Sequence, residues 1–215
     1  MIVTRQKPYE EILMYLKGKE QIIIFGCSQC ATLSGSGGEQ EVNELAEKLE
    51  ADGKRITGKG VLKEPCHLLL TKREIKGFSD EITSSEAALV MSCGAGVQTV
   101  ASLINIPVFP GCNSLFLAST LRYGHFEEKC SMCGDCMLAY TGGICVVTGC
   151  AKHMINGPCG GIKDEKCEIG DGRECVWVSV FKRMRARGEL DHLKKVFAPL
   201  DHSIKTSIKS VRVNK

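Results

Sequence analysis

Short apolar runs alternate with helical patterns in the first half of the chain. The run 21–25 is apolar enough for a buried strand, and it ends at Gly26 and Cys27. A Gly/Ser turn follows, and the helix predicted after it has apolar positions spaced i, i+3, i+4 and i+7: Val42, Leu45, Ala46 and Leu49. The sequence therefore predicts a strand, a loop and a helix in that order.

The same order recurs further along the chain. Residues 87–91 predict a second strand, which runs into Cys93 and then into a helix with the apolar positions Val97, Val100, Ala101 and Ile104. Further strands are predicted within 54–64 and over 106–109, and a helix over 8–17 precedes them all. Alternating strands and helices predict an α/β fold with a small parallel, Rossmann-like sheet and helical crossovers.

From about residue 126 the pattern changes. Eight cysteines and many glycines fall between Cys130 and Cys175, and helical periodicity resumes only at Val176. We therefore predict an α/β domain over 1–125, a cysteine-rich region over 126–176, and C-terminal helices with a tail over 177–215. Because the middle region has few large apolar residues, we expect bound metal to order it.

Composition narrows the function. Lys and Arg number 28 against 25 Asp and Glu, so the net charge of +3 is too small for a nucleic-acid binder by bulk electrostatics. Neither a signal peptide nor a membrane span is evident, and we expect a cytoplasmic protein. The thirteen cysteines are the outlier. In a reducing compartment, cysteines at this spacing more often bind metal or act in redox chemistry than form disulfides.

One group of cysteines follows the predicted strands. Parallel strands end at the same sheet edge, so these thiols should converge there and form a four-ligand metal site. The ligands predicted for this site are Cys27, Cys30, Cys66 and Cys93. The spacing Cys27-x2-Cys30 is as typical of zinc as of iron, and Cys112 is left without a site.

The second group has the most specific motif in the chain. Two-residue gaps in Cys130-x2-Cys133-x2-Cys136 let one tight loop wrap a metal–sulfur core, which predicts a 4Fe-4S cluster whose fourth ligand comes from elsewhere. The cofactor-binding cysteines predicted in this region are Cys130, Cys133, Cys136, Cys145, Cys150, Cys159, Cys167 and Cys175. They suffice for two sites, so one to three clusters are expected in the whole chain. The spacing leaves open which four belong together, and zinc remains the alternative at each site.

Several motifs together resemble one known family. They are Thr141–Cys145, Cys150–Lys152, Asn156–Gly161 and Cys175–Trp177, with Cys93–Thr99 and Pro110–Phe116 upstream. The sequence resembles the methylenetetrahydrofolate reductase C-terminal family, the cysteine-rich small subunit of the reductases of acetogenic and related anaerobic bacteria. It departs from the pattern at Val146, where proline is expected after Cys145.

The resemblance implies an iron–sulfur electron-transfer subunit of the Wood–Ljungdahl pathway of one-carbon metabolism. The implied partner is a catalytic reductase subunit that carries FMN or FAD and the folate site, and further electron-donor subunits are conceivable. On this interpretation the present chain is an oxidoreductase subunit without catalytic residues of its own. The alternative is a zinc-structured scaffold or assembly subunit that carries no electrons. A nucleotide-binding enzyme is disfavoured, because neither Gly-rich turn completes the GxGxxG fingerprint.

Overall fold

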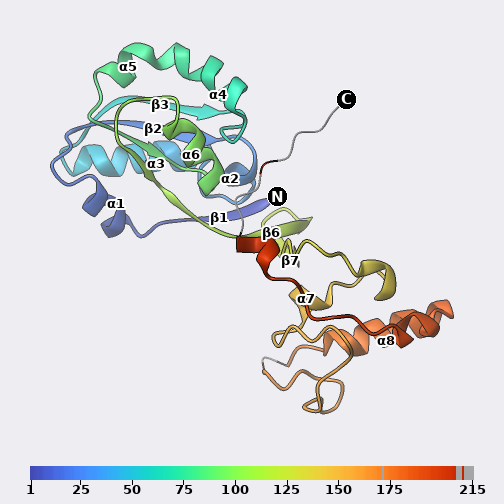
Figure 1. Cartoon of the computed structure of the whole chain (residues 1–215). Coiled ribbons are helices and arrows are strands. Elements are labelled where there is room, and N and C mark those ends of the chain that lie inside the picture. The colour runs from blue at the N-terminus through green and yellow to red at the C-terminus, as the bar shows by residue number, and fades with distance from the viewer. Residues whose placement is uncertain (171, 207–209, 211–215) are drawn as a thin grey trace. The chain divides into compact units, whose positions relative to one another are not determined.

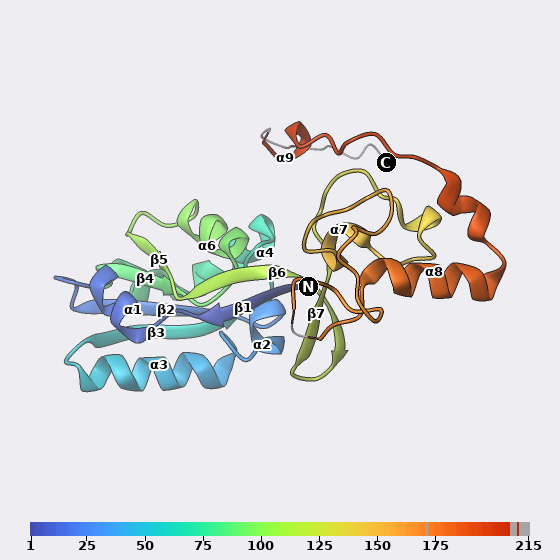
Figure 2. The ribbon, with the colours of Figure 1, turned by 90° about the horizontal axis from the view of Figure 1, so that it is seen from below.

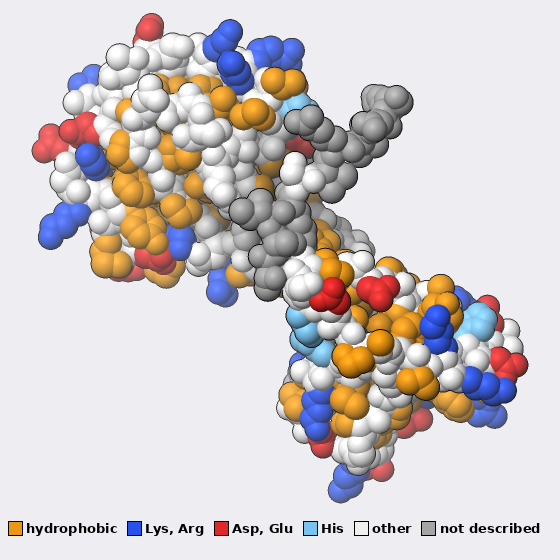
Figure 3. All heavy atoms as spheres, viewed as in Figure 1, with side chains coloured by type: hydrophobic (Ala, Val, Ile, Leu, Met, Phe, Trp, Pro, Cys, Tyr) orange, Lys and Arg blue, Asp and Glu red, His pale blue; other side chains and the backbone are white. Residues whose placement is uncertain are grey.

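The computed structural model describes residues 1–170, 172–206 and 210, and the chain divides into two compact units. Unit 1 is Met1–Glu127 and unit 2 is Glu128–Lys215. Each is described by itself (Figure 1). Basic and acidic side chains are mixed over the face of both units seen in Figure 3, in keeping with the small net charge. No helix among the described residues is long and apolar enough to cross a membrane.

A four-stranded parallel sheet forms the centre of unit 1, and this confirms the predicted α/β fold. The strand order is β3-β2-β4-β5, so that β2 and β4 are the two inner strands. The strands are β2 (Gln21–Cys27), β3 (Arg55–Leu62), β4 (Ala87–Val90) and β5 (Val108–Pro110). The predicted strands all exist, with bounds that shift by at most two residues.

Helices cover both faces of this sheet (Figure 2). Residues of α1 and α3 share one core cluster, and residues of α4, η1, α5 and α6 belong to or pack against another. The helices are α1 (Tyr9–Tyr15), α3 (Glu39–Ala51), α4 (Leu68–Ile75), the 3-10 helix η1 (Lys76–Phe78), α5 (Ser79–Thr83) and α6 (Gly94–Ala101). The sequence prediction missed the helices between residues 68 and 83, and Ile104 lies beyond the end of α6.

β2 supplies both cores. Its side chains alternate between the two faces of the sheet, as they do along any strand. Ile22 and Ile24 lie in the cluster with α1 and α3, whereas Ile23 and Phe25 lie in the cluster on the opposite face. All four side chains are fully buried, which explains why the sequence of this strand is a continuous apolar run.

A second sheet, which the sequence analysis did not predict, has the order β1-β6-β7. Its strands are β1 (Ile2–Gln6), β6 (Cys112–Arg122) and β7 (His125–Cys130), and β7 crosses the boundary between the two units. β1 pairs antiparallel with β6. Because most side chains of β6 and β7 are exposed or half-buried, their sequence lacks the apolar run that identified the other strands.

Unit 2 consists mostly of loops around one long helix. Its elements are η2 (Leu138–Tyr140), α7 (Val146–Gly149), α8 (Val176–Arg187), η3 (Leu190–Lys194) and α9 (Ser203–Thr206). The helix predicted from Val176 is confirmed as α8. The helix expected over Leu190–Phe197 is instead a short 3-10 helix, and Phe197 lies beyond it.

A small apolar core holds the loops of unit 2 against α8. Trp177, Val180 and Met184 of the helix are buried with Met137 and with a pair from α7, Val146 and Val147. Val146, the position that departs from the family pattern, is fully buried there. The cysteine-rich region therefore has an apolar core of its own, smaller than either core of unit 1.

The first Gly-rich turn packs tightly over the carboxyl edge of the main sheet. A Cβ added at Gly37 would lie 2.1 Å from the carbonyl oxygen of Met91, just after β4. The Gly37 carbonyl itself accepts a hydrogen bond from the Cys27 N–H at 2.8 Å. At the start of α3, the N–H of Gly38 donates to the carboxylate of Glu41 at 2.8 Å. The helix start is capped by its own acidic side chain, so the turn serves close packing rather than phosphate binding.

Replacing Gly37 by alanine should lower the free energy of unfolding of unit 1 by about 1–3 kcal/mol, because the new methyl group has to displace backbone. Urea denaturation followed by far-ultraviolet circular dichroism measures the change. Gly77→Ala is the matched control, since an added Cβ there meets nothing within 4 Å. Equal denaturation midpoints for the two variants would contradict the close-packing role.

Candidate metal centre

The thiols of unit 1 lie where the parallel strands end. Cys27 is the last residue of β2, and Cys30 begins the short helix α2 (Cys30–Leu33). Cys66 follows β3, and Cys93 is the residue that caps the start of α6. Because the chain leaves β2 for β3 on one side and returns to β4 on the other, Cys27 and Cys93 flank the point where the strand order reverses. In parallel α/β sheets, this is where ligands bind.

Electrostatic interactions connect these thiols. Burial raises the pKa of Cys27. Backbone N–H groups of Ala31 and Gln29 form hydrogen bonds with its sulfur and lower the pKa, whereas the charges of Cys30 and Cys93 raise it further. Burial also raises the pKa of Cys66, and the charges of Cys93 and Cys27 contribute again. As thiolates, Cys27, Cys66 and Cys93 would therefore repel one another, and Cys30 would repel Cys27. A bound cation would remove that repulsion, and four thiolates are a donor set that suits zinc or iron.

Close packing brings the Cys66 loop to the Cys93 turn. A Cβ at Gly96, in the first turn of α6, would lie 3.1 Å from the ring of Pro65 and 2.5 Å from the hydroxyl of Ser92. Only a residue without a side chain leaves room for this approach. Gly96 therefore permits the close approach of Pro65, the neighbour of Cys66, to the turn that contains Cys93.

Cys112 differs from the other thiols of unit 1. It is 5% exposed, lies in the core cluster with α1 and α3, and its thiol donates to the Ser36 carbonyl at 3.2 Å. Burial raises its pKa to about 12. A thiol that stays protonated and has a hydrogen-bond acceptor suits a core position, in agreement with its omission from the predicted ligands.

In unit 2, four of the eight cysteines line one small cavity. They are Cys150, Cys159, Cys167 and Cys175. The cavity measures about 10 Å³, and Trp177 forms part of its wall. An ion pair of Lys152 with Glu168 also borders it, and the thiol of Cys159 lies 3.6 Å from a carboxylate oxygen of Glu168. The structure thus groups four cysteines that the spacing alone left unassigned.

Two loops of unit 2 point backbone N–H groups at cysteine sulfur. Met132 donates to Cys130 Sγ at 3.3 Å, and Met154 donates to Cys150 Sγ at 3.5 Å. Each loop contains a left-handed residue, Met132 with φ 53° and His153 with φ 52°. Such backbone is costly for residues other than glycine and persists only where the surroundings require it. N–H groups aimed at thiolate sulfur are what a metal–thiolate site needs.

The remaining four cysteines of unit 2 are spread more widely. Cys133 and Cys145 pack against the apolar core, whereas Cys130 and Cys136 are exposed. All thirteen thiols of the chain are free. Within the described residues, no three Cys, His, Asp or Glu side chains have the spacing of a finished metal site in either unit. The cysteine thiols are therefore suitable ligands for a metal. Among the described residues, however, they are not yet arranged with the spacing of a metal site.

These features define a class: a cysteine-rich α/β protein with thiols gathered at the strand ends and in the loops of a second unit. Residues 109–203 match a family model described as "Methylene-tetrahydrofolate reductase C terminal". The match confirms the resemblance over slightly less than half of the chain. It contains all eight cysteines of unit 2 and Cys112, and the other four cysteines of unit 1 precede it. No curated protein and no solved structure gives a significant match.

The left-handed backbone at Met132 leads to a test. Met132→Val should destabilise unit 2 by about 1–2 kcal/mol relative to Met132→Gly, because a β-branched residue tolerates this backbone worst and glycine best. The Met132 side chain is 61% exposed, so little packing is lost in either variant. The single tryptophan of the chain, Trp177, lies in the core of unit 2, and its fluorescence during urea denaturation reports unfolding there.

Met14 supplies the control for this comparison. It is 68% exposed and lies in helix α1. In a helix the order should reverse, with Met14→Gly less stable than Met14→Val by a few tenths of a kcal/mol, because glycine loses the most backbone entropy. Circular dichroism follows unit 1 in this case. If Met132→Val is at least as stable as Met132→Gly, as expected for the pair at Met14, the left-handed backbone at Met132 has no energetic consequence.

Proposed function

We propose that this chain is the iron–sulfur electron-transfer subunit of a methylenetetrahydrofolate reductase complex of the acetogen type. The observation that carries the proposal is the pair of loops in unit 2 whose left-handed residues accompany N–H groups aimed at Cys130 and Cys150 sulfur. The family match over residues 109–203 supports the link to such a reductase. A 4Fe-4S cluster held by four thiolates supplies one-electron transfer when bound.

The residues around the thiols would support that role. Amides that donate to Cys130 and Cys150 stabilise sulfur as thiolate, the form that binds metal. The exposed positions of Cys130 and Cys136 would put a centre held by them near the surface, where electrons can pass to another chain. The folate and flavin sites, on this proposal, belong to the partner subunit.

At the strand ends of unit 1, Cys27, Cys30, Cys66 and Cys93 would hold a further metal. The two N–H groups directed at Cys27 and the mutual repulsion of the thiolates support this assignment. Cys112 stays outside the set because its thiol is hydrogen-bonded in the core.

One observation favours a second candidate, a zinc-structured subunit without electron transfer. The cavity between Cys150, Cys159, Cys167 and Cys175 measures about 10 Å³, which is room for one water-sized sphere. That volume is closer to the space that a single zinc ion needs than to the space that a four-iron cluster needs. Iron and zinc content therefore separates the two candidates directly.

The metal content of cysteine variants tests the assignment. In anaerobically purified protein, Cys130→Ser, Cys133→Ser and Cys136→Ser should each lower iron by about four atoms per chain, because each removes a ligand of one 4Fe-4S cluster. Mass spectrometry of acid-digested protein gives iron and zinc together. Loss of the cluster should also expose the loops of unit 2 to limited proteolysis, since the apolar core there is small.

Two further variants complete this experiment. Cys66→Ser should reduce the metal bound by unit 1, whereas Cys112→Ser should leave the metal content of the whole chain unchanged. Near-wild-type iron in all three variants of the Cys130 loop would refute the cluster assignment. If the wild-type protein contains zinc and no iron, the zinc-structured scaffold is the better assignment.

Dependence on a partner gives the decisive functional test. The purified chain should accept electrons from a low-potential donor, yet bind no flavin and turn over no methylenetetrahydrofolate. Mixed with the flavin-carrying subunit, it should be reduced before the flavin is, which stopped-flow spectra resolve. The matched control is the same chain stripped of metal. If flavin reduction keeps its rate with the stripped chain, electron transfer through this subunit is refuted.

A further inference from the structure

Unit 2 contains a second, larger cavity that the metal proposal does not use. It measures about 450 Å³, within the range of small-molecule sites. Its walls come from separate loops and from α8, and they include four aromatic side chains: Tyr140, Trp177, Phe181 and Phe197. Figure 3 shows how hydrophobic side chains gather beside basic ones on the visible face of unit 2.

Hydrogen bonds and ring contacts fix the cavity walls. Asn156 holds the Phe197 backbone with two hydrogen bonds, accepting from its N–H at 2.7 Å and donating to its carbonyl at 2.8 Å. Phe197 contacts Tyr140 edge to face, with ring centroids 5.3 Å apart. Trp177 donates from its indole N–H to the Met154 carbonyl at 2.9 Å. The rings are thus positioned before any ligand arrives, which favours binding of a flat apolar group.

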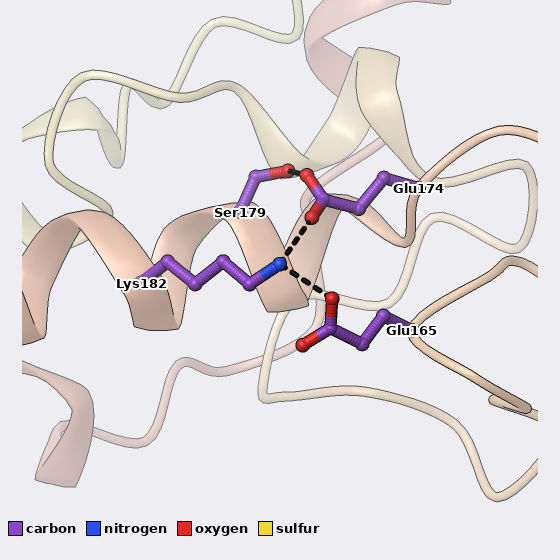
Figure 4. Close-up of polar contacts among 4 residues, drawn as sticks. All are labelled: Glu165, Glu174, Ser179 and Lys182. Carbon is purple, nitrogen blue, oxygen red and sulfur yellow. Dashed lines mark hydrogen bonds and ion pairs between the residues drawn. The ribbon is translucent and has the colours of Figure 1, made fainter.

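The charged groups of the cavity differ in whether they already have a partner. Glu165 is paired with Lys182 at 2.6 Å, and Lys182 also binds Glu174 at 2.7 Å (Figure 4). Lys195 lies 4.4 Å from the centre of the Tyr140 ring and donates to the Tyr140 hydroxyl at 3.1 Å. Among the described residues, no carboxylate pairs with Lys195. The cavity therefore combines aromatic walls with Lys195, a cation that lies over the Tyr140 and Phe197 rings and has no anionic partner in the described part of the chain.

We propose that this cavity binds a planar aromatic molecule that carries an anionic group, with its ring against Phe181 and the Tyr140–Phe197 pair and its anion at Lys195. Trp177 lines both this cavity and the cysteine cavity, so the bound ring lies beside a wall of the candidate metal centre. The site is independent of which metal the thiols bind and of whether the chain transfers electrons.

Calorimetric titration of the full chain, purified with its own metal, tests the site. The probes are 2-naphthoate and the uncharged 2-naphthamide, which share the ring and differ in the charge. We expect 2-naphthoate to bind more tightly. Lys195→Gln should weaken it by about two- to fivefold, because an exposed ion pair contributes modestly, and should leave 2-naphthamide unchanged. Phe181→Ala should weaken both probes by about two- to tenfold, through the lost ring contact.

Lys194→Gln is the matched control. Lys194 is the neighbour of Lys195 in sequence, but it pairs with Asp191 at 2.6 Å and does not line the cavity. Its replacement should leave both affinities unchanged. Phe181 is 47% exposed, so its truncation should spare the core of unit 2, which Trp177 fluorescence verifies. Absence of naphthoate binding, equal binding of the two probes, or equal effects of the two lysine variants would overturn the proposal.

Discussion

The parallel pairing of β2 with β3 and β4 is the interaction on which unit 1 depends. It places the alternating side chains of one strand in two cores, and it brings three strand ends to one edge. The thiols follow those ends, so the same backbone hydrogen bonds that build the sheet also gather Cys27, Cys66 and Cys93.

Unit 2 has a single apolar core, which contains fewer buried residues than either core of unit 1. Its single core joins α8 to α7, and the cysteine loops around it include four left-handed residues other than glycine: Met132, His153, Asp164 and Glu165. Each such residue typically costs about 1–2 kcal/mol. A small core offsets such costs poorly, whereas structural metal typically contributes about 10 kcal/mol or more to the folding of small domains. This energetic imbalance supports the proposal of metal in unit 2 more strongly than the cysteine count does.

Sequence periodicity predicted all four strands of the main sheet and the helices α1, α3, α6 and α8, but it missed β1, β6, β7 and the helices between residues 68 and 83. The sequence predicted β2 and α3 because their apolar residues face a core. It predicted α8 from the apolar positions Val176, Val180 and Met184, which are spaced i, i+4 and i+8. The strands β6 and β7 pair through their backbone, and few of their side chains contact a core, so no apolar pattern identifies them. Strand topology predicted that cysteines follow the ends of β2, β3 and β4, and the structure places Cys27, Cys66 and Cys93 there; their common metal site stays a prediction. No local rule predicted the grouping of Cys150 with Cys175, because it depends on the paths of long loops.

The start of α8 links the two cavities of unit 2. Cys175 caps the helix and lines the cysteine cavity, and Trp177, two residues later, separates that cavity from the aromatic one. The backbone N–H of Cys175 is held by the Glu165 carbonyl at 2.8 Å, and the Glu165 side chain lines the aromatic cavity. A metal bound by Cys175 would therefore fix the helix start, and with it one wall of the aromatic site.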